Sequence, residues 1–244
     1  MRKLLLLIVL GAIPILMAPV IQVIGTKAPS PGVVKTWGST PVQSVYSNGL
    51  TGATFNITVP ATGLGNLLFI QLTDTSGSAA YVSAVSGGGT WVVPTAGSST
   101  CQFVDNSAGS VGCAYVLSST SGTTTITITP TITTDYYSVE YWEESWTGGG
   151  SASLDIAGSV SHNSALTSIP GVTLSLGGND VCFQDIVLNG GTPVLSISSP
   201  YNTNAVYQGF YGYANAANIT TSTSPSWTST SLDTAAVVGA ACFE

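Results

Sequence analysis

The sequence predicts an all-β protein, a two-sheet antiparallel β-sandwich that follows an N-terminal apolar segment. Short β-rich runs recur along the chain, separated by clusters of Gly, Ser, Asn and Pro. No stretch after residue 25 has apolar residues at helical spacing. About ten such runs in roughly 205 residues, without a helix, fit two packed sheets.

The N-terminal element comprises residues 1–25. Arg2 and Lys3 precede an uncharged apolar run at residues 4–24. This pattern is typical of a secretion signal, and the run is also long enough to span a bilayer. A cut after Gly25 is sterically allowed, although no A-x-A motif is present, so a cleaved signal peptide and a retained membrane anchor both stay open. In either case the positive start predicts a secreted or cell-surface protein, touching membrane only through residues 4–24 if they are retained.

Residues 26–39 are predicted to form an extended stalk, because Pro29 and Pro31 favour extended backbone. Residues 40–244 are assigned to one β-sandwich domain without an evident internal repeat. Its predicted strands are 53–59, 66–73, 80–85, 112–117, 123–129, 136–146, 172–176, 180–188, 194–198 and 234–243.

Two of these strands have informative patterns. Residues 66–72 are almost continuously apolar, which predicts a central strand buried on both faces. Ile126 and Ile128 alternate with threonines, which predicts a strand with one solvated face.

Four cysteines in an exported chain predict disulfides. Three pairings are formally open, and we favour Cys101–Cys113 with Cys182–Cys242. The first pair would close a hairpin, because residues 111–117 read as a strand and the preceding DNSAGS as a turn.

Low charge excludes several functions. Charged residues make up 6% of the chain, against about 25% in ordinary globular proteins. After residue 25 only Lys27 and Lys35 are positive, so the surface has no electrostatic footprint for nucleic acid. With a single histidine and no C-x-x-C motif, neither a metal site nor a cofactor is predicted.

Several motifs resemble a widespread group of secreted prokaryotic β-sandwich domains. The likeness extends over nearly all of the chain after residue 40 and rests on turn glycines, core aromatics and alternating strands. Two residues depart from the pattern. Members usually have an acidic residue or Asn at the position of Gly88, and many have Glu at the position of Ser145. The motifs are Val42–Ser44, Thr58–Pro60, Gly65–Leu68, Val82–Trp91, Ala114-Tyr115, Gly122–Thr129, Trp146–Gly148, Leu154-Asp155, Trp227 and Phe243.

The resemblance implies a lectin-like, jelly-roll architecture and a surface location. Most members of the group have no assigned activity. The resemblance therefore transfers no catalytic residue to this chain.

One acidic segment could carry chemistry, with Glu140, Glu143 and Glu144 among aromatic residues. Paired carboxylates near aromatic rings are what glycoside hydrolysis uses. In a strand, however, Glu140 and Glu144 share one face with Trp142 and Trp146, whereas Glu143 points to the other. The two carboxylates on the shared face would lie about 13 Å apart, too far for either glycosidase class. We expect no enzyme, but an ordinary strand with core tryptophans and solvated glutamates.

The remaining polar motifs are weaker. His162 lies in an SHNS stretch without a nucleophile elbow, so a solvated loop histidine is expected. Asp105, Asp155 and Asp180 could contribute to a calcium site, although their spacing does not match a known loop. Asn56 and Asn218 begin acceptor patterns for N-glycosylation.

The leading hypothesis is a non-catalytic extracellular structural or adhesive module. Its partners would be copies of itself, joined by strand addition through residues 40–45 or the stalk. A carbohydrate-binding module is the first alternative, and a virion-associated structural protein is the second. The candidate ligand-contact residues are Trp142, Trp146, Tyr207, Tyr211 and Tyr213.

Overall fold

The computed structural model describes residues 34–75, 79–105, 107–164, 166–189, 195–207, 211–233 and 235–244. These residues form antiparallel β-sheets packed against one another, with no helix among them, so the all-β sandwich class is confirmed. In the described part of the chain no helix is long and apolar enough to cross a membrane. The predicted signal or anchor and residues 26–33 of the stalk lie outside the described residues.

Strands β2 to β9 form the first unit. A five-stranded sheet with the order β2-β9-β4-β7-β6 faces a three-stranded sheet with the order β3-β8-β5. The bounds are β2 (Gln43–Leu50), β3 (Phe55–Thr58), β4 (Leu67–Asp74), β5 (Val82–Ser86), β6 (Phe103–Asp105), β7 (Gly109–Val116), β8 (Thr125–Pro130) and β9 (Tyr137–Glu144).

Strands β11 to β18 form the second unit and repeat the topology of the first. The sheet orders are β11-β18-β13-β16-β15 and β12-β17-β14. Each strand of the second unit therefore corresponds to one of the first, from β11 and β2 to β18 and β9. The bounds are β11 (Leu154–His162), β12 (Leu166–Pro170), β13 (Asp180–Asn189), β14 (Leu195–Ile197), β15 (Asn202–Tyr207), β16 (Tyr211–Ile219), β17 (Ser226–Asp233) and β18 (Ala235–Phe243).

Both units have a jelly-roll strand order, except that the fifth strand of each, β6 or β15, joins the five-stranded sheet. The two units therefore repeat the same topology, although the sequence shows no evident internal repeat.

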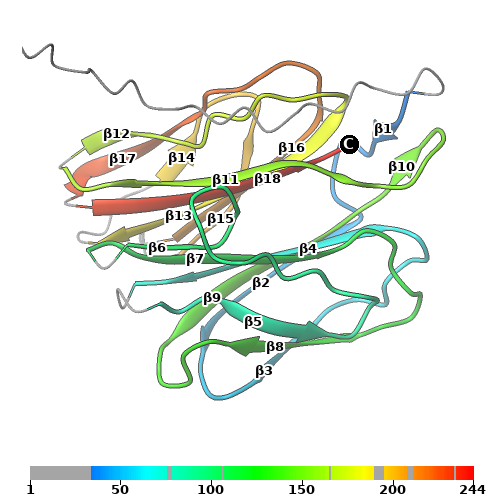
Figure 1. The fold of residues 1–244 in the computed structure, drawn as a ribbon, viewed down its shortest axis with the longest axis horizontal. Helices are drawn as coiled ribbons and strands as arrows, with labels where there is room; N and C mark the ends of the chain where they lie inside the picture. Colours follow the sequence, from blue (N-terminus) through cyan, green and yellow to red (C-terminus); the bar gives the residue numbers. More distant parts are fainter. Residues whose placement is uncertain are drawn as a thin grey trace, which may run out of the picture.

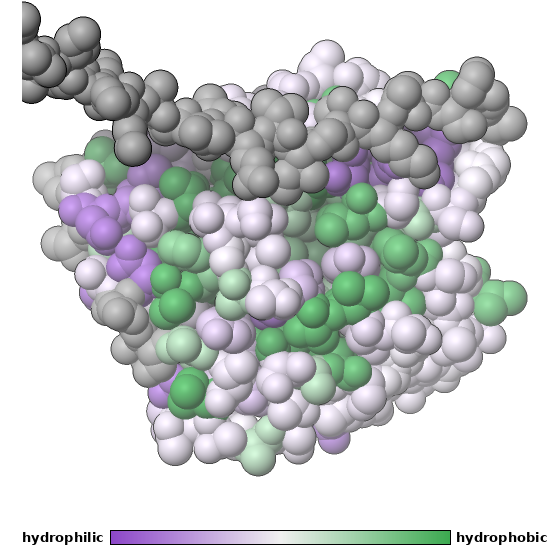
Figure 2. Space-filling view, viewed as in Figure 1, coloured by the Kyte–Doolittle hydropathy of each residue, from purple (hydrophilic) through white to green (hydrophobic). Residues whose placement is uncertain are grey.

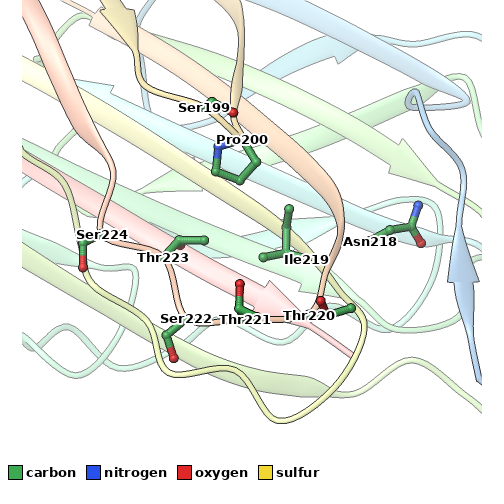
Figure 3. A pocket seen from close by; sticks show the side chains of 9 residues that line it. All are labelled: Ser199, Pro200, Asn218, Ile219, Thr220, Thr221, Ser222, Thr223 and Ser224. Carbon is green, nitrogen blue, oxygen red and sulfur yellow. The ribbon is translucent and has the colours of Figure 1, made fainter.

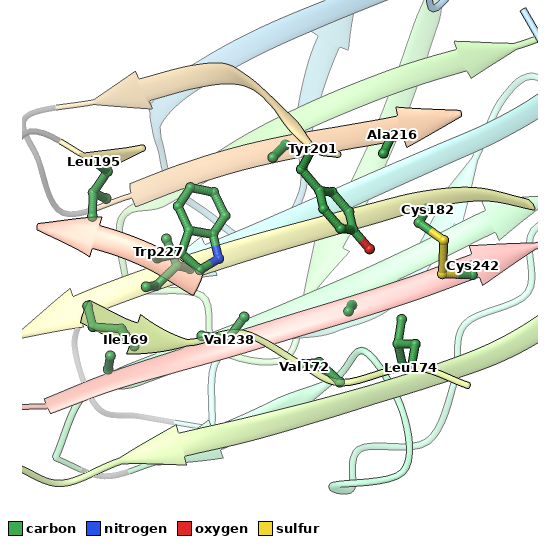
Figure 4. Packing of buried hydrophobic residues seen from close by; sticks show 14 of the residues in the cluster. Ile169, Val172, Leu174, Cys182, Leu195, Tyr201, Ala216, Trp227, Val238 and Cys242 are labelled. Atoms are coloured by element: carbon green, nitrogen blue, oxygen red, sulfur yellow. A yellow bond between two sulfur atoms is a disulfide. The ribbon is translucent and has the colours of Figure 1, made fainter. Parts of the chain in front are cut away.

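The two units stack into four layers (Figure 1). Each unit has its own core between its two sheets, and a further aromatic core lies where the five-stranded sheets face each other. The core of the second unit contains Trp227, Tyr201 and the Cys182–Cys242 disulfide, and Tyr201 lies on the side of the disulfide (Figure 4). The inner sheets thus bury both faces, and their central strands β4, β7, β9, β13 and β18 are buried along almost their whole length.

The strand predictions succeed where burial is unambiguous. β4 lies between β9 and β7 and is buried along its whole length, as a central strand should be. β8 alternates buried and more accessible residues around Ile126 and Ile128. The strand predicted at 172–176 is wrong, because there only Leu174 forms an isolated bridge, to Thr223.

Both predicted disulfides are present, which is typical of an oxidising compartment. Cys101 and Cys113 lie at the β6–β7 hairpin, with Cα atoms 5.7 Å apart. Cys182 and Cys242 face each other across β13 and β18.

A short clasp joins the two units. β1 (Thr36–Trp37) pairs with β10 (Trp146–Thr147), which connects the units along the chain. The Trp37 backbone also exchanges hydrogen bonds of 2.9 and 3.0 Å with the Asn218 amide, and the Trp37 indole donates to the carbonyl of Asn179. The end of the predicted stalk is therefore part of the folded body.

Candidate functional site

The acidic strand predicted from the sequence is β9, and it lies second in the inner sheet of the first unit. The expected alternation of faces holds. Trp142 points into the core between the two units, whereas Tyr141 points into the core of the first unit. Glu144 is on the Trp142 face and accepts a 3.0 Å hydrogen bond from Asn215 of the second unit.

Trp142 is fully buried and belongs to an aromatic cluster shared by both units. Its ring lies 5.9 Å from Phe69 in the first unit, 5.1 Å from Phe183 and 6.2 Å from Tyr213 in the second. Tyr213 is also fully buried, and its hydroxyl lies 2.6 Å from the Thr73 hydroxyl. These two candidate ligand-contact residues therefore hold the units together and are closed to a glycan.

The glutamates of β9 are buried, so the expectation of solvated carboxylates is wrong. Glu140 and Glu144 are 2% and 0% exposed, because the second unit covers the face that a single sandwich would leave open. One oxygen of each has no hydrogen-bond partner among the described residues. Burial raises the pKa of Glu140 to about 8, and it raises the pKa of Glu144 to about 8 despite the Asn215 hydrogen bond.

Glu143 has a different environment on the opposite face. Its carboxylate accepts hydrogen bonds from the backbone N–H of Gly63, at 2.7 Å, and from the side chains of Gln43 and Asn66. Gln43 lies on β2, and the other two donors lie in the loop before β4. The Glu143 carboxylate thus fixes a loop and an edge strand.

The other candidate contact residues are dispersed. Trp146 is half-buried, and its ring lies 5.1 Å from Trp37, with the Lys35 ammonium 5.2 Å from its centre. Tyr211 is half-buried on the inner sheet of the second unit, paired with Tyr207 across β15 and β16. The five candidates therefore do not form one platform.

The remaining sequence candidates have local partners. His162 is the last residue of β11 rather than a loop residue, and its ring nitrogen lies 2.8 Å from the Pro170 carbonyl. Asn56 is exposed on β3, and its side-chain oxygen accepts a 2.7 Å hydrogen bond from the Thr127 hydroxyl. The Asn218 amide is occupied by the Trp37 backbone, which makes it a poor glycosylation acceptor.

A shallow pocket of about 490 Å³ lies beside Asn218 (Figure 3). The Ser199–Pro200 turn faces the end of β16 and the residues that follow it, 218–224, and the lining consists of hydroxyls, one amide and two apolar side chains. Without a titratable group, this lining offers a ligand only neutral hydrogen bonds.

Of the three aspartates considered for calcium, the structure brings two together. Asp155 and Glu244 are both acidic neighbours of Asp180 and act on its carboxyl electrostatically. Asp105 lies elsewhere, where it accepts hydrogen bonds from Ser107 and Asn163. The sequence does not single out Glu244, because it is an isolated acidic residue after an apolar run.

No family model, curated protein or solved structure matches this chain.

Proposed function

We propose that this chain is a non-catalytic extracellular structural module that assembles with copies of itself. The observation that carries the proposal is the burial of Glu140, Trp142, Glu144 and Tyr213 between the two units. The side chains that could have served catalysis or sugar stacking are used to join the sandwiches. What remains outside is a weakly charged surface, pale or green over most of the face in Figure 2.

The edge of β2 is the best acceptor for a strand from a second copy. β2 is the terminal strand of an inner sheet and spans eight residues, Gln43–Leu50. At the matching edge of the second unit, the N–H of Ser159 on β11 is bonded to the Ser98 carbonyl. β6, at the other edge of the first inner sheet, has only three residues. Residues 43–45, expected as donors, are themselves in β2, so the donor must come from elsewhere in the chain.

The experiment compares assembly of the exported protein with that of two lysine variants. Ser44→Lys places a charge at an exposed position of β2, and a lysine on an edge strand opposes strand addition. Thr125→Lys is the matched control, because Thr125 is exposed on β8, the middle strand of its sheet.

We expect light scattering and electron microscopy to show assemblies for the wild type and Thr125→Lys, and at least about tenfold fewer for Ser44→Lys. A wild type that stays monomeric at high concentration would contradict the proposal.

A second candidate, a virion-associated structural protein, is favoured by the doubled jelly-roll order, since jelly rolls are common in viral capsids. The analogy is at the level of the fold alone. In the same micrographs, closed shells in place of filaments or sheets would support this candidate.

A further inference from the structure

Three carboxylates meet at one end of the second unit. Asp155 is at the start of β11, Asp180 begins β13, and Glu244 follows the last residue of β18. β18 lies between the other two strands, with Phe243 opposite both Leu154 and Val181. The register therefore places all three acids at the same end of three neighbouring strands.

A glycine turn lies against this group. The N–H of Gly177 donates a 2.8 Å hydrogen bond to Asp155 Oδ2. A Cβ atom at Gly178 would lie 3.5 Å from both Asp180 Oδ1 and Glu244 Oε2. Residues 177 and 178 thus line the space between the three carboxylates, and the absence of side chains leaves that space open.

Asp180 lacks any protein donor there. It is fully buried, and neither of its carboxylate oxygens has a hydrogen-bond partner among the described residues. Burial, then Asp155 and Glu244, raise its pKa to about 8, and the nearby Lys35 ammonium opposes the rise. A buried carboxylate without a hydrogen-bond donor and with two acidic neighbours is costly when ionised, so the site favours a bound cation or a proton on Asp180.

Lys35 supplies only part of the required charge. Its ammonium donates to the carbonyl oxygens of Ser151, at 2.8 Å, and of Glu244, at 2.7 Å. When all three carboxylates are ionised, the single positive charge of Lys35 leaves an excess of two negative charges, which a divalent ion would balance.

The ligands are not yet within one coordination sphere. Among the described residues, the only three ligand-type side chains with atoms within 4.8 Å of one another are Asp180, Cys182 and Cys242. The disulfide removes both sulfurs as ligands. A carboxylate site therefore requires the side chains of Asp155, Asp180 and Glu244 to move closer together when the ion binds.

We propose that Asp155, Asp180 and Glu244 bind one divalent cation, and that the ion is Ca²⁺. Hard carboxylate oxygens in an adaptable arrangement suit Ca²⁺ better than Mg²⁺, which demands near-ideal octahedral geometry. The ion ties the ends of β11, β13 and β18 together. This site is independent of the proposed function, since assembly through β2 involves the other unit.

The first experiment measures melting of the full chain at pH 8, in a chelator and then in about 10 mM CaCl₂. Extracellular calcium modules bind with Kd values of about 10⁻⁴ to 10⁻³ M, so this concentration approaches saturation. We expect a rise of about 3 °C in the wild type, the shift that a tenfold ligand excess gives a chain of this size. Asp155→Asn and Asp180→Asn should abolish it, whereas Asp105→Asn, at an acid outside the cluster, should keep it.

A second measurement does not depend on stability. Tb³⁺ substitutes for Ca²⁺ and emits when a nearby tryptophan is excited, and the Trp37 indole donates a 2.9 Å hydrogen bond to Asn179, next to Asp180. We expect sensitised Tb³⁺ emission from the wild type and Asp105→Asn, displaced by Ca²⁺ and lost in Asp180→Asn. Absence of both calcium effects, or their persistence in Asp180→Asn, would overturn the proposal.

Discussion

Trp142 shows how a single residue can join the two units. It comes from β9 of the first unit, yet two of its aromatic neighbours, Phe183 and Tyr213, belong to the second. Its indole N–H has no hydrogen-bond partner among the described residues, so its contribution is one of packing. Removing the ring would open a cavity between sheets that are fixed on both sides by their own cores.

We predict that Trp142→Ala lowers the free energy of unfolding by about 3–5 kcal/mol, the usual cost of truncating a fully buried large aromatic residue. Trp146→Ala, at a half-buried position, should cost clearly less, about 1–2 kcal/mol. Denaturant unfolding of both variants measures the difference. Equal losses would mean that the inter-unit core is not tightly packed around Trp142.

The sequence predicted which residues of β9 share a face, but it did not predict what covers that face. Alternation is local and follows from strand geometry. The burial of Glu140 and Glu144 depends on the second unit, which contributes Asn215 from far along the chain. Because carboxylates are seldom fully buried, the residue types alone predict that Glu140 and Glu144 are exposed to solvent.

At the scale of elements, the two disulfides constrain loops of different length. Cys101 and Cys113 are separated by 12 positions in the sequence, and Cys182 and Cys242 by 60. The longer loop loses more conformational entropy in the unfolded chain when it is closed.

We therefore predict that replacing Cys182 and Cys242 by Ala costs about 4 kcal/mol, against about 3 kcal/mol for the same change at Cys101 and Cys113. Denaturant unfolding under non-reducing conditions gives both values, and each variant serves as the control for the other. A larger loss from the shorter loop would contradict the loop-entropy explanation.

Strand prediction depended on composition. The sequences of β4, β13 and β18 are rich in apolar residues, and the sequence predicts all three strands. β16 has the sequence YGYANAANI, and its Gly, Ala and Asn residues are poor strand formers, so it was missed. It is a strand because β13 and β15 pair with it on either side.

At the scale of the molecule, the repeated topology could not be predicted from the residues. Equivalent strands such as β9 (YSVEYWEE) and β18 (AAVVGAACF) share burial but little sequence. Each needs only apolar side chains toward its own core, and many sequences meet that requirement. The four-layer stack then buries a second face of both inner sheets, where Glu140, Glu144 and Asp185 are enclosed.

The enclosed acids determine how stability depends on pH. Glu140, Glu144 and Asp180 have a folded-state pKa raised to about 8, chiefly by burial, and the pKa of Asp185 is also raised by burial. Well below the ordinary pKa values of 4.5 for Glu and 3.8 for Asp, both the folded and unfolded states hold these protons, and the fold carries no penalty. As the pH rises from there toward 8, only the unfolded chain releases them, so unfolding becomes more favourable.

We predict that the free energy of unfolding, measured with denaturant in the presence of a chelator, falls steadily between about pH 4.5 and 8. Replacing Glu140 and Glu144 by Gln together should flatten this decline, because the amide stays neutral, while Asp180 and Asp185 preserve part of it. Asp105→Asn is the control. Slight burial acts to raise the pKa of Asp105, but its hydrogen bonds together lower it, so this variant should leave the decline in place. If the free energy of unfolding rises over this interval, or declines as steeply in the double variant as in the wild type, the buried carboxylates do not cause the pH dependence.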